Sequence, residues 1–139
     1  LALHPDDEIL GCGGILLRSL GNGAVVRVLY FTDGKPAILL EEIKNVGLKA
    51  GYESLFFHYP LNRIPLNEGS LARLRDEVGK FDPDVISLPF LFDDHDDHRR
   101  VNQLFLEFCR RGSLRNDVEI WAYQVYGSLI PNVIVDITD

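Results

Sequence analysis

Cysteine is scarce in this chain, and its placement argues against several classes of protein. Cys12 and Cys109 are the only two cysteines, and they lie far apart without a C-x-x-C pair. A disulfide framework and a cysteine-based zinc ribbon are therefore not expected. We expect both thiols to be small buried apolar groups. This usage fits a reducing compartment and predicts a cytoplasmic protein.

Positive charge and long apolar runs are also lacking. The chain has 14 Lys and Arg residues against 21 Asp and Glu residues, a formal net charge of -7. Binding to a phosphate backbone needs a basic face, so we expect no nucleic-acid partner. No apolar run approaches the roughly 18–20 residues of a membrane span, and no signal peptide is visible, so we expect no transmembrane segment.

The residues that are present have the balance of an ordinary globular domain. Hydrophobic residues make up 46% of the chain and charged residues 25%. A chain of 139 residues can bury a core without a disulfide or a metal staple. A metal site in it is therefore expected to serve function before folding.

Strand-like and helix-like segments alternate along the chain. Apolar residues recur at helical spacing over residues 9–20, 41–50, 67–80 and 97–111. Short apolar runs predict strands over residues 1–3, 24–31, 54–58, 84–88, 118–125 and 132–137. This order predicts an α/β fold, a Rossmann-like three-layer sandwich with a mostly parallel sheet and helices on both faces.

Two polar clusters follow strands of this predicted sheet. One is His4-Pro5-Asp6-Asp7-Glu8, directly after residues 1–3, and the other covers residues 93–100 after the strand at 84–88. Ligands of such sheets bind beyond the carboxyl ends of the strands, so both clusters lie where chemistry is expected. Three of the four histidines belong to these clusters, and His58, which does not, is expected to be a structural or rim residue.

The spacing within the clusters favours a catalytic metal site. His4 and Asp7 are three residues apart across a proline turn, and His95 and His98 are three apart at a helix start. Imidazole and carboxylate ligands with one open position suit catalytic zinc (Zn2+), with Fe2+ also possible. The adjacent acids Asp6 and Asp7 allow one to bind the metal while the other takes a proton from metal-bound water.

Plainer interpretations exist for each cluster taken alone. The acidic run at residues 93–97 is typical of a solvated loop or a helix N-terminus, and Asp6 and Asp7 can cap the following helix. A lone His4 would more often be structural. The glycines at residues 11–14 lack the G-x-G-x-x-G fingerprint of a dinucleotide site. The coincidence of both clusters on one rim favours a shared metal site.

At these residues the chain resembles the zinc-dependent de-N-acetylases of the LmbE / PIG-L type. The resemblance rests on the motifs Leu3-His4-Pro5-Asp6-Asp7-Glu8, Thr32-Asp33-Gly34 and His95-Asp96-Asp97-His98-Arg99, and on the segment 131–138. It implies that His4, Asp7 and His98 bind zinc. It also implies that Asp6 is the general base. His95 would stabilise the oxyanion and help protonate the leaving amine, and Asp97 would orient the His95 ring.

The resemblance implies removal of the acetyl group from an N-acetylglucosamine-type amide, with metal-bound water as nucleophile and a small-molecule amino-sugar conjugate as substrate. Arg63 and Arg99 are candidate substrate contacts, although a solvated surface role is equally open. The family usually has an Arg and a Glu after the Thr-Asp-Gly turn, whereas residues 35–42 contain no Arg. We expect residues 1–139 to be a single domain that lacks the extreme N-terminus and a C-terminal portion.

The alternative to an enzyme is a catalytically weak metal- and glycan-binding module of the same fold. The sequence does not indicate the oligomeric state.

Overall fold

The computed structural model describes residues 1–34 and 37–138, so Lys35, Pro36 and Asp139 lie outside the described residues. Helices and strands alternate in the order α1 (Asp7–Gly21), β1 (Arg27–Thr32), α2 (Ala37–Ala50), β2 (Glu53–Tyr59), α3 (Glu68–Phe81), β3 (Val85–Pro89), α4 (Asp96–Arg110) and β4 (Glu119–Tyr123). The predicted α/β class is confirmed. Within the described residues, no helix is long and apolar enough to cross a bilayer.

The sheet consists of two parallel pairs joined by the N-terminal residues. β1 pairs with β2, and β3 pairs with β4. Ala2 forms a single parallel bridge with Tyr30 of β1, and the terminal amine of Leu1 donates to the Ser87 carbonyl of β3. The strand predicted at residues 1–3 is therefore reduced to one bridge, and it connects the two pairs.

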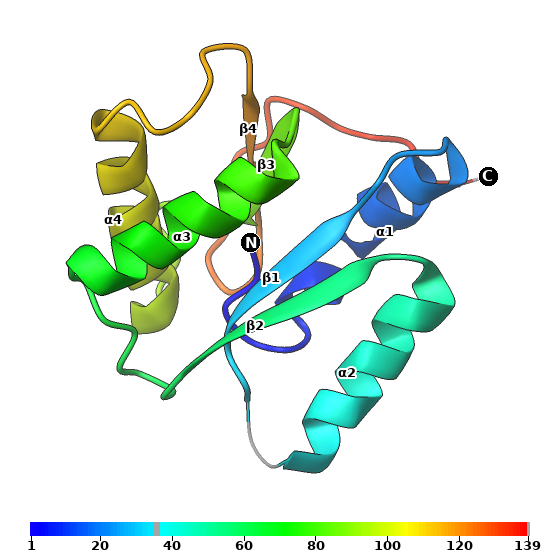
Figure 1. The fold of residues 1–139 in the computed structure, drawn as a ribbon. Coiled ribbons are helices and arrows are strands. Elements are labelled where there is room, and N and C mark those ends of the chain that lie inside the picture. The colour runs from blue at the N-terminus through cyan, green and yellow to red at the C-terminus, as the bar shows by residue number, and fades with distance from the viewer. Residues whose placement is uncertain (35–36, 139) are drawn as a thin grey trace.

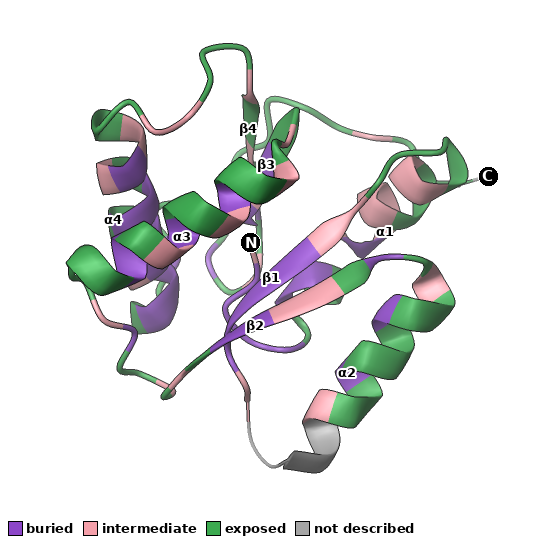
Figure 2. Cartoon of the chain, viewed as in Figure 1, coloured by how far each residue is buried: buried purple, intermediate pink, exposed green. Residues whose placement is uncertain are grey.

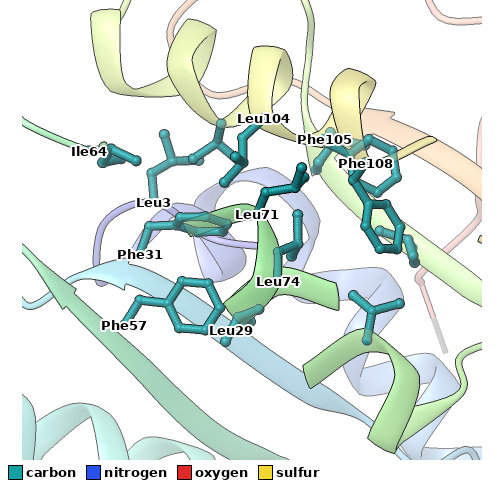
Figure 3. Packing of buried hydrophobic residues seen from close by; sticks show 14 residues of the cluster. Leu3, Leu29, Phe31, Phe57, Ile64, Leu71, Leu74, Leu104, Phe105 and Phe108 are labelled. Carbon is teal, nitrogen blue, oxygen red and sulfur yellow. The ribbon is translucent and has the colours of Figure 1, made fainter. Parts of the chain in front are cut away.

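The core has two parts, one on each face of β1. Leu29 and Phe31 face a cluster to which α3 and α4 contribute half of the buried residues (Figure 3), whereas Val28 and Tyr30 face a cluster that includes residues of α1 and α2. Strand residues point alternately to the two faces, so a strand covered on both faces is apolar throughout. Figures 1 and 2 show the buried strand β1 between these two groups of helices, which are the layers predicted from the sequence.

The helix ends follow the sequence closely where a capping residue is present. Asn67, predicted to open a helix, is the N-cap of α3, where its side chain accepts from the Ser70 N–H at 3.0 Å and completes a capping box. Helix α2 begins earlier than predicted, at Ala37. Cys12 and Cys109 are free thiols, and both are half-buried, which is less than the full burial predicted for them.

The strand predicted at residues 132–137 is wrong. This segment has no regular secondary structure, and Ile134 is 86% exposed. A short apolar run predicted a strand, but a strand also needs a neighbour with free N–H and C=O groups. No strand among the described residues pairs with this segment. It lies against α1 instead, where the Arg18 guanidinium donates to the Asp136 carbonyl and Ile137 covers Gly14.

Candidate metal centre

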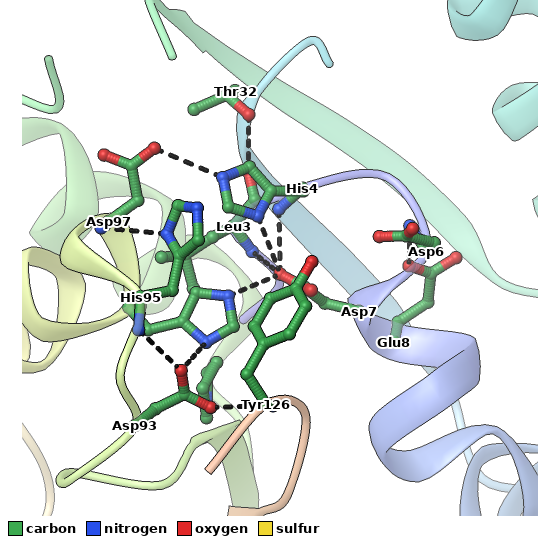
Figure 4. Close-up of polar contacts among 12 residues, drawn as sticks. Leu3, His4, Asp6, Asp7, Glu8, Thr32, Asp93, His95, Asp97 and Tyr126 are labelled. Atoms are coloured by element: carbon green, nitrogen blue, oxygen red, sulfur yellow. Dashed lines mark hydrogen bonds and ion pairs between the residues drawn. The ribbon is translucent and has the colours of Figure 1, made fainter. Parts of the chain in front are cut away.

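The side chains suited to chemistry meet where the chain leaves the carboxyl ends of the strands (Figure 4). Buried carboxylates form hydrogen bonds between the loops that follow these strands. The Asn62 N–H, after β2, donates to Asp97 Oδ2 at 2.8 Å, and the Tyr126 N–H, after β4, donates to Asp93 Oδ2 at 3.0 Å. Because Asp93 and Asp97 both follow β3, three strand ends are fixed relative to one another.

Asp7 fixes the first motif from the start of α1. Its Oδ2 accepts the backbone N–H of His4 at 2.9 Å and that of Leu3 at 3.1 Å. The carboxylate is fully buried. Burial acts to raise the pKa of Asp7, but the His98 ring and the His4 N–H outweigh it and hold the pKa below its usual value. Asp7 is therefore an ionised, immobile carboxylate.

Three imidazoles gather beside this carboxylate. His4, His95 and His98 each offer a ring nitrogen, and these atoms lie within 4.8 Å of one another. The ring centroids are 4.6 Å apart for His4 and His95, and 5.2 Å apart for His95 and His98. His98 is fully buried and His4 is 9% exposed. Two motifs more than 90 residues apart thus converge, as the sequence predicted.

Two of the imidazoles are each held between carboxylates. His4 Nε2 lies 3.2 Å from Asp97 Oδ2, and its Nδ1 lies 3.6 Å from Asp7 Oδ2. His98 Nδ1 lies 3.3 Å from Asp93 Oδ1, and its Nε2 lies 3.3 Å from Asp7 Oδ2. Histidines that bind metals use this arrangement, in which one ring nitrogen contacts a carboxylate and the other faces the ion.

The third imidazole has a different role. His95 is the N-cap of α4, and its Nδ1 accepts the Asp97 N–H at 3.2 Å. A neutral ring with an accepting Nδ1 carries its proton on Nε2, which makes Nε2 a donor and not a metal ligand. Burial and the neighbouring charges of His4 and His98 lower the pKa of His95, which favours this neutral form.

The remaining donor set fits a divalent ion. Two ligands of a tetrahedral zinc ion, each at about 2.0–2.2 Å, lie about 3.3–3.6 Å apart. The separations from Asp7 Oδ2 to His4 Nδ1 and to His98 Nε2 are 3.6 and 3.3 Å. Asp7 Oδ1 and His98 Nε2 are buried without a hydrogen-bond partner, an arrangement that costs stability and that an ion bound beside them would relieve.

Asp6 lies at the edge of this cluster. Figure 4 shows its carboxylate beside Glu8 and apart from the imidazoles. Asp6 is exposed and makes no side-chain cap to α1, although it occupies the N-cap position. Partial burial and the neighbouring charge of Asp7 raise its pKa. The side chain is thus an exposed carboxylate near the cluster, with an enhanced affinity for a proton.

The structure places Asp97 differently from the prediction. Its backbone N–H contacts the His95 ring, and its carboxylate contacts His4 Nε2 and the Asn62 N–H. No bond between the Asp97 carboxylate and His95 occurs among the described residues. Asp97 therefore orients His95 through its backbone and His4 through its side chain.

The two predicted arginine contacts do not join the cluster. Arg63 is exposed, and Arg99 is exposed and pairs with Asp96 at 2.6 Å. Over residues 1–34 and 37–138, no hydrogen bond joins either guanidinium to the histidines. His58 lies at the same edge of the sheet, where its Nδ1 is 2.6 Å from Asp33 Oδ1.

Sequence reasoning missed two residues of the site. Asp93 is fully buried, and it holds both the His98 ring and the loop after β4. Tyr126 lies on that loop, with its ring centroid 5.6 Å from that of His95 and 5.5 Å from that of His98. The position of Tyr126 just after a parallel strand was the available signal, because the other site residues also follow strand ends.

Comparisons with known proteins identify the family and the fold of this chain. The family model described as PIG-L: GlcNAc-PI de-N-acetylase matches residues 1–109. The solved structure of the conserved protein TT1542 from Thermus thermophilus is 24% identical, with a TM-score of 0.85 over 99% of this chain and 70% of that chain. A search of curated proteins found no match.

Two further solved structures share the fold. The N,N'-diacetylchitobiose deacetylase from Pyrococcus horikoshii, complexed with its inhibitor, is 24% identical, with a TM-score of 0.77 over 97% of this chain and 61% of that chain. GalB, the 4-carboxy-2-hydroxymuconate hydratase from Pseudomonas putida KT2440, is 19% identical, with a TM-score of 0.66 over 87% of this chain and 60% of that chain. Because a hydratase and a deacetylase share this architecture, the fold alone does not decide the reaction.

Proposed function

This chain belongs to the PIG-L family of GlcNAc-PI de-N-acetylases, and on that premise we propose that it is a metal-dependent hydrolase that removes the acetyl group from an N-acetylglucosamine-type amide. The observation that carries the proposal is the buried donor set of His4, Asp7 and His98, whose spacing suits one divalent ion. An acid and a third imidazole lie at its edge, and groups of these types can serve as general base and general acid in amide hydrolysis.

His4, Asp7 and His98 are the proposed metal ligands. An imidazole and carboxylate set suits zinc, and iron(II) is also compatible. An ion held there supplies Lewis acidity, which lets water ionise near neutral pH and polarises an amide carbonyl. Asp97 and Asp93 keep the two imidazoles oriented and make them better electron donors.

Asp6 is the proposed general base. Its raised pKa strengthens it as a proton acceptor, and its freedom from helix capping lets the side chain turn toward the imidazoles. The proton that it takes comes from the attacking water. Catalytic contacts of this kind often tighten only when substrate is bound.

His95 is the proposed donor to the oxyanion and then to the leaving amine. Its Nδ1 accepts from the Asp97 backbone, so the Nε2 proton is available to the reacting group. A neutral ring is sufficient for the hydrogen bond to the oxyanion. Transfer of a proton to the leaving amine requires the imidazolium form, which the family resemblance implies for His95 and which returns to the neutral ring when it gives up that proton.

The proposed substrate is a small-molecule amino-sugar conjugate. Tyr126 is 58% exposed beside His95 and His98, and it offers an aromatic wall and a hydroxyl at the mouth of the site. Arg63 and Arg99 are proposed contacts for the group attached to the sugar. For Arg99 this requires release from Asp96.

The test is acetate release from a panel of N-acetylglucosamine conjugates by zinc- or iron-loaded protein. We expect the Asp6→Asn variant to keep its metal and to lose roughly a hundredfold to ten-thousandfold in kcat, because it lacks only the base. Parent-like turnover in this variant would exclude Asp6 as the base. The second candidate, a metal- and glycan-binding module, is favoured by the outward position of Asp6, and metal and sugar binding without acetate release would establish it.

A further inference from the structure

We propose that Glu8, held by Tyr52, positions Asp6 for proton transfer. The inference rests on the proposed role of Asp6 as a base, and it assigns a function to two buried residues that the proposed mechanism does not use. Glu8 contacts neither metal ligands nor substrate in this scheme. It acts on the backbone of Asp6.

The backbone of Asp6 has an unusual conformation for its position. An aspartate at a helix N-cap ordinarily has an extended backbone and binds a first-turn N–H with its carboxylate. Asp6 has φ 137° and ψ -25°, and its side chain makes no cap bond. A residue with a Cβ is strained in this region, so the surrounding structure must stabilise the conformation. The result is a carboxylate that remains free of the helix.

Glu8 supplies a bond that opposes relaxation of this strain. Its Oε2 accepts the Asp6 N–H at 3.2 Å, and its side chain is buried, with 4% exposed. Asp7 takes the N–H groups of residues 3 and 4, and Pro5 has none. Every backbone N–H from residue 3 to residue 6 is therefore bound by a carboxylate of the first turn of α1.

Tyr52 fixes the other oxygen of Glu8. The Tyr52 hydroxyl donates to Glu8 Oε1 at 3.2 Å, and the residue is 5% exposed. Its backbone N–H donates to the Gly47 carbonyl at 2.9 Å, and its ring lies so close to Gly47 that an added Cβ would be 3.0 Å away. The turn between α2 and β2 thus fixes the position of the Tyr52 hydroxyl. This hydroxyl donates to Glu8, and Glu8 accepts the backbone N–H of Asp6.

Removal of the Glu8 acceptor should release the Asp6 backbone. Without Glu8 Oε2, this backbone can relax to the extended region, and the Asp6 carboxylate then caps α1 and is lost as a base. The paired variants Glu8→Gln and Glu8→Met test this, because both have a similar size but only Gln keeps an oxygen for the Asp6 N–H and a polar group for the Tyr52 hydroxyl.

Tyr30 offers a graded comparison for Tyr52. Both tyrosines belong to the same buried cluster. Burial raises the pKa of Tyr30, and Glu8 and Tyr52 raise it further, so its hydroxyl lies close to these two groups. Among the described residues, no hydrogen bond of normal geometry joins the Tyr30 hydroxyl to either group. Tyr52→Phe removes the donor to Glu8, whereas Tyr30→Phe removes only a neighbouring hydroxyl, so we expect the smaller effect from Tyr30→Phe.

The kinetic experiment measures kcat, KM and metal content for the parent and these four variants. We expect Glu8→Met to lower kcat roughly tenfold or more, as for loss of one bond to a charged group, with KM and metal content unchanged. Glu8→Gln should restore most of the parent kcat. Tyr52→Phe should lower kcat several-fold, and Tyr30→Phe should lower it less. Equal kcat in Glu8→Gln and Glu8→Met, or in the two tyrosine variants, would overturn the proposal.

A crystal structure of Glu8→Met gives a readout that does not depend on activity. We expect φ of Asp6 to become negative and its carboxylate to approach the first-turn N–H groups. A positive φ retained in Glu8→Met would overturn the proposal. If the parent releases no acetate but φ relaxes in the variant, the positioning of Asp6 stands and the proposed hydrolase function fails. Should Glu8→Met not fold, the structure of Tyr52→Phe decides by the loss or retention of the 3.2 Å contact between Glu8 and Asp6.

Discussion

The histidine cluster at the carboxyl edge of the sheet and the arginine network between α3 and α4 show how little ion-pair distance says about function. In the arginine network, Arg111 lies 2.7 Å from both Glu68 and Glu107. The pair of His98 and Asp7 is looser, at 3.3 Å. The Glu68 side chain is 78% exposed, whereas both members of the histidine pair are fully buried.

The two regions differ in whether their polar groups have hydrogen-bond partners. Exposed guanidinium–carboxylate pairs are solvated and contribute little to stability, however short they are. In the histidine cluster, both ring nitrogens of His98 and Asp7 Oδ1 lack hydrogen-bond partners, which costs stability. Several such groups gathered at one point indicate a functional site, because one bound ion or ligand would satisfy more than one of them. The looser pair is therefore the better indicator of chemistry.

The largest effect is expected from Asp7→Asn. This change keeps the shape of the side chain but removes the charge that faces both His4 and His98. We expect loss of bound metal and a fall in acetate release on the order of a thousandfold or more, because the Lewis-acid contribution disappears. Metal analysis and an acetate assay measure the two effects.

The matched control is Glu107→Gln, the same loss of charge in the exposed network. It should retain both metal and activity. Equal behaviour of the two variants would break the distinction between the buried and exposed regions.

A smaller effect is expected from Asp97→Asn, which can be compared with the same change at the neighbouring, exposed Asp96. The Asp97 carboxylate is fully buried and contacts His4 Nε2, whereas the Asp96 side chain is 76% exposed and pairs with Arg99. Carboxylates behind metal-binding histidines typically contribute about 10–100-fold in metal affinity. We expect a loss of that size in Asp97→Asn and none in Asp96→Asn, measured by competition with a metal-binding dye.

The smallest effect is expected in the exposed network itself. Arg110 and Arg111 lower the pKa of Glu107 from 4.5 to about 2. A carboxyl group whose pKa is lower in the folded state stabilises the fold when the pH is above the pKa of the unfolded chain. For Glu107 this contribution is lost as the pH falls from about 4.5 through about 2. Because the group is exposed, Glu107→Gln should produce only a small change in acid denaturation, and added salt should diminish it. A large change that is independent of salt would contradict this account.

Much of the fold could be predicted because its signals are local. Leu71, Leu74 and Val78 at helical spacing, behind the cap Asn67, predict α3 within one residue of its observed start. The strand predicted at residues 132–137 failed for the opposite reason. An apolar run is a property of the segment alone, whereas strand formation depends on a partner elsewhere in the chain.

The site could be predicted in outline but not in its hydrogen bonding. The proposed ligands converge because the carboxyl ends of parallel strands lie at one edge of the sheet. The alternation of strands and helices in the sequence predicts this topology. Which group the Asp97 carboxylate contacts depends on the geometry of the helix start at His95. Residue spacing in the sequence does not specify that geometry. The direction of the Asp6 side chain likewise depends on its backbone conformation, which residue spacing does not encode.

The most direct test of the central claim is anomalous diffraction from crystals of the parent protein soaked with zinc. We predict a single strong peak within bonding distance of His4 Nδ1, His98 Nε2 and the Asp7 carboxylate, with His95 outside it. A peak bound by His95 in place of Asp7, or no peak between His4 and His98, would contradict the account.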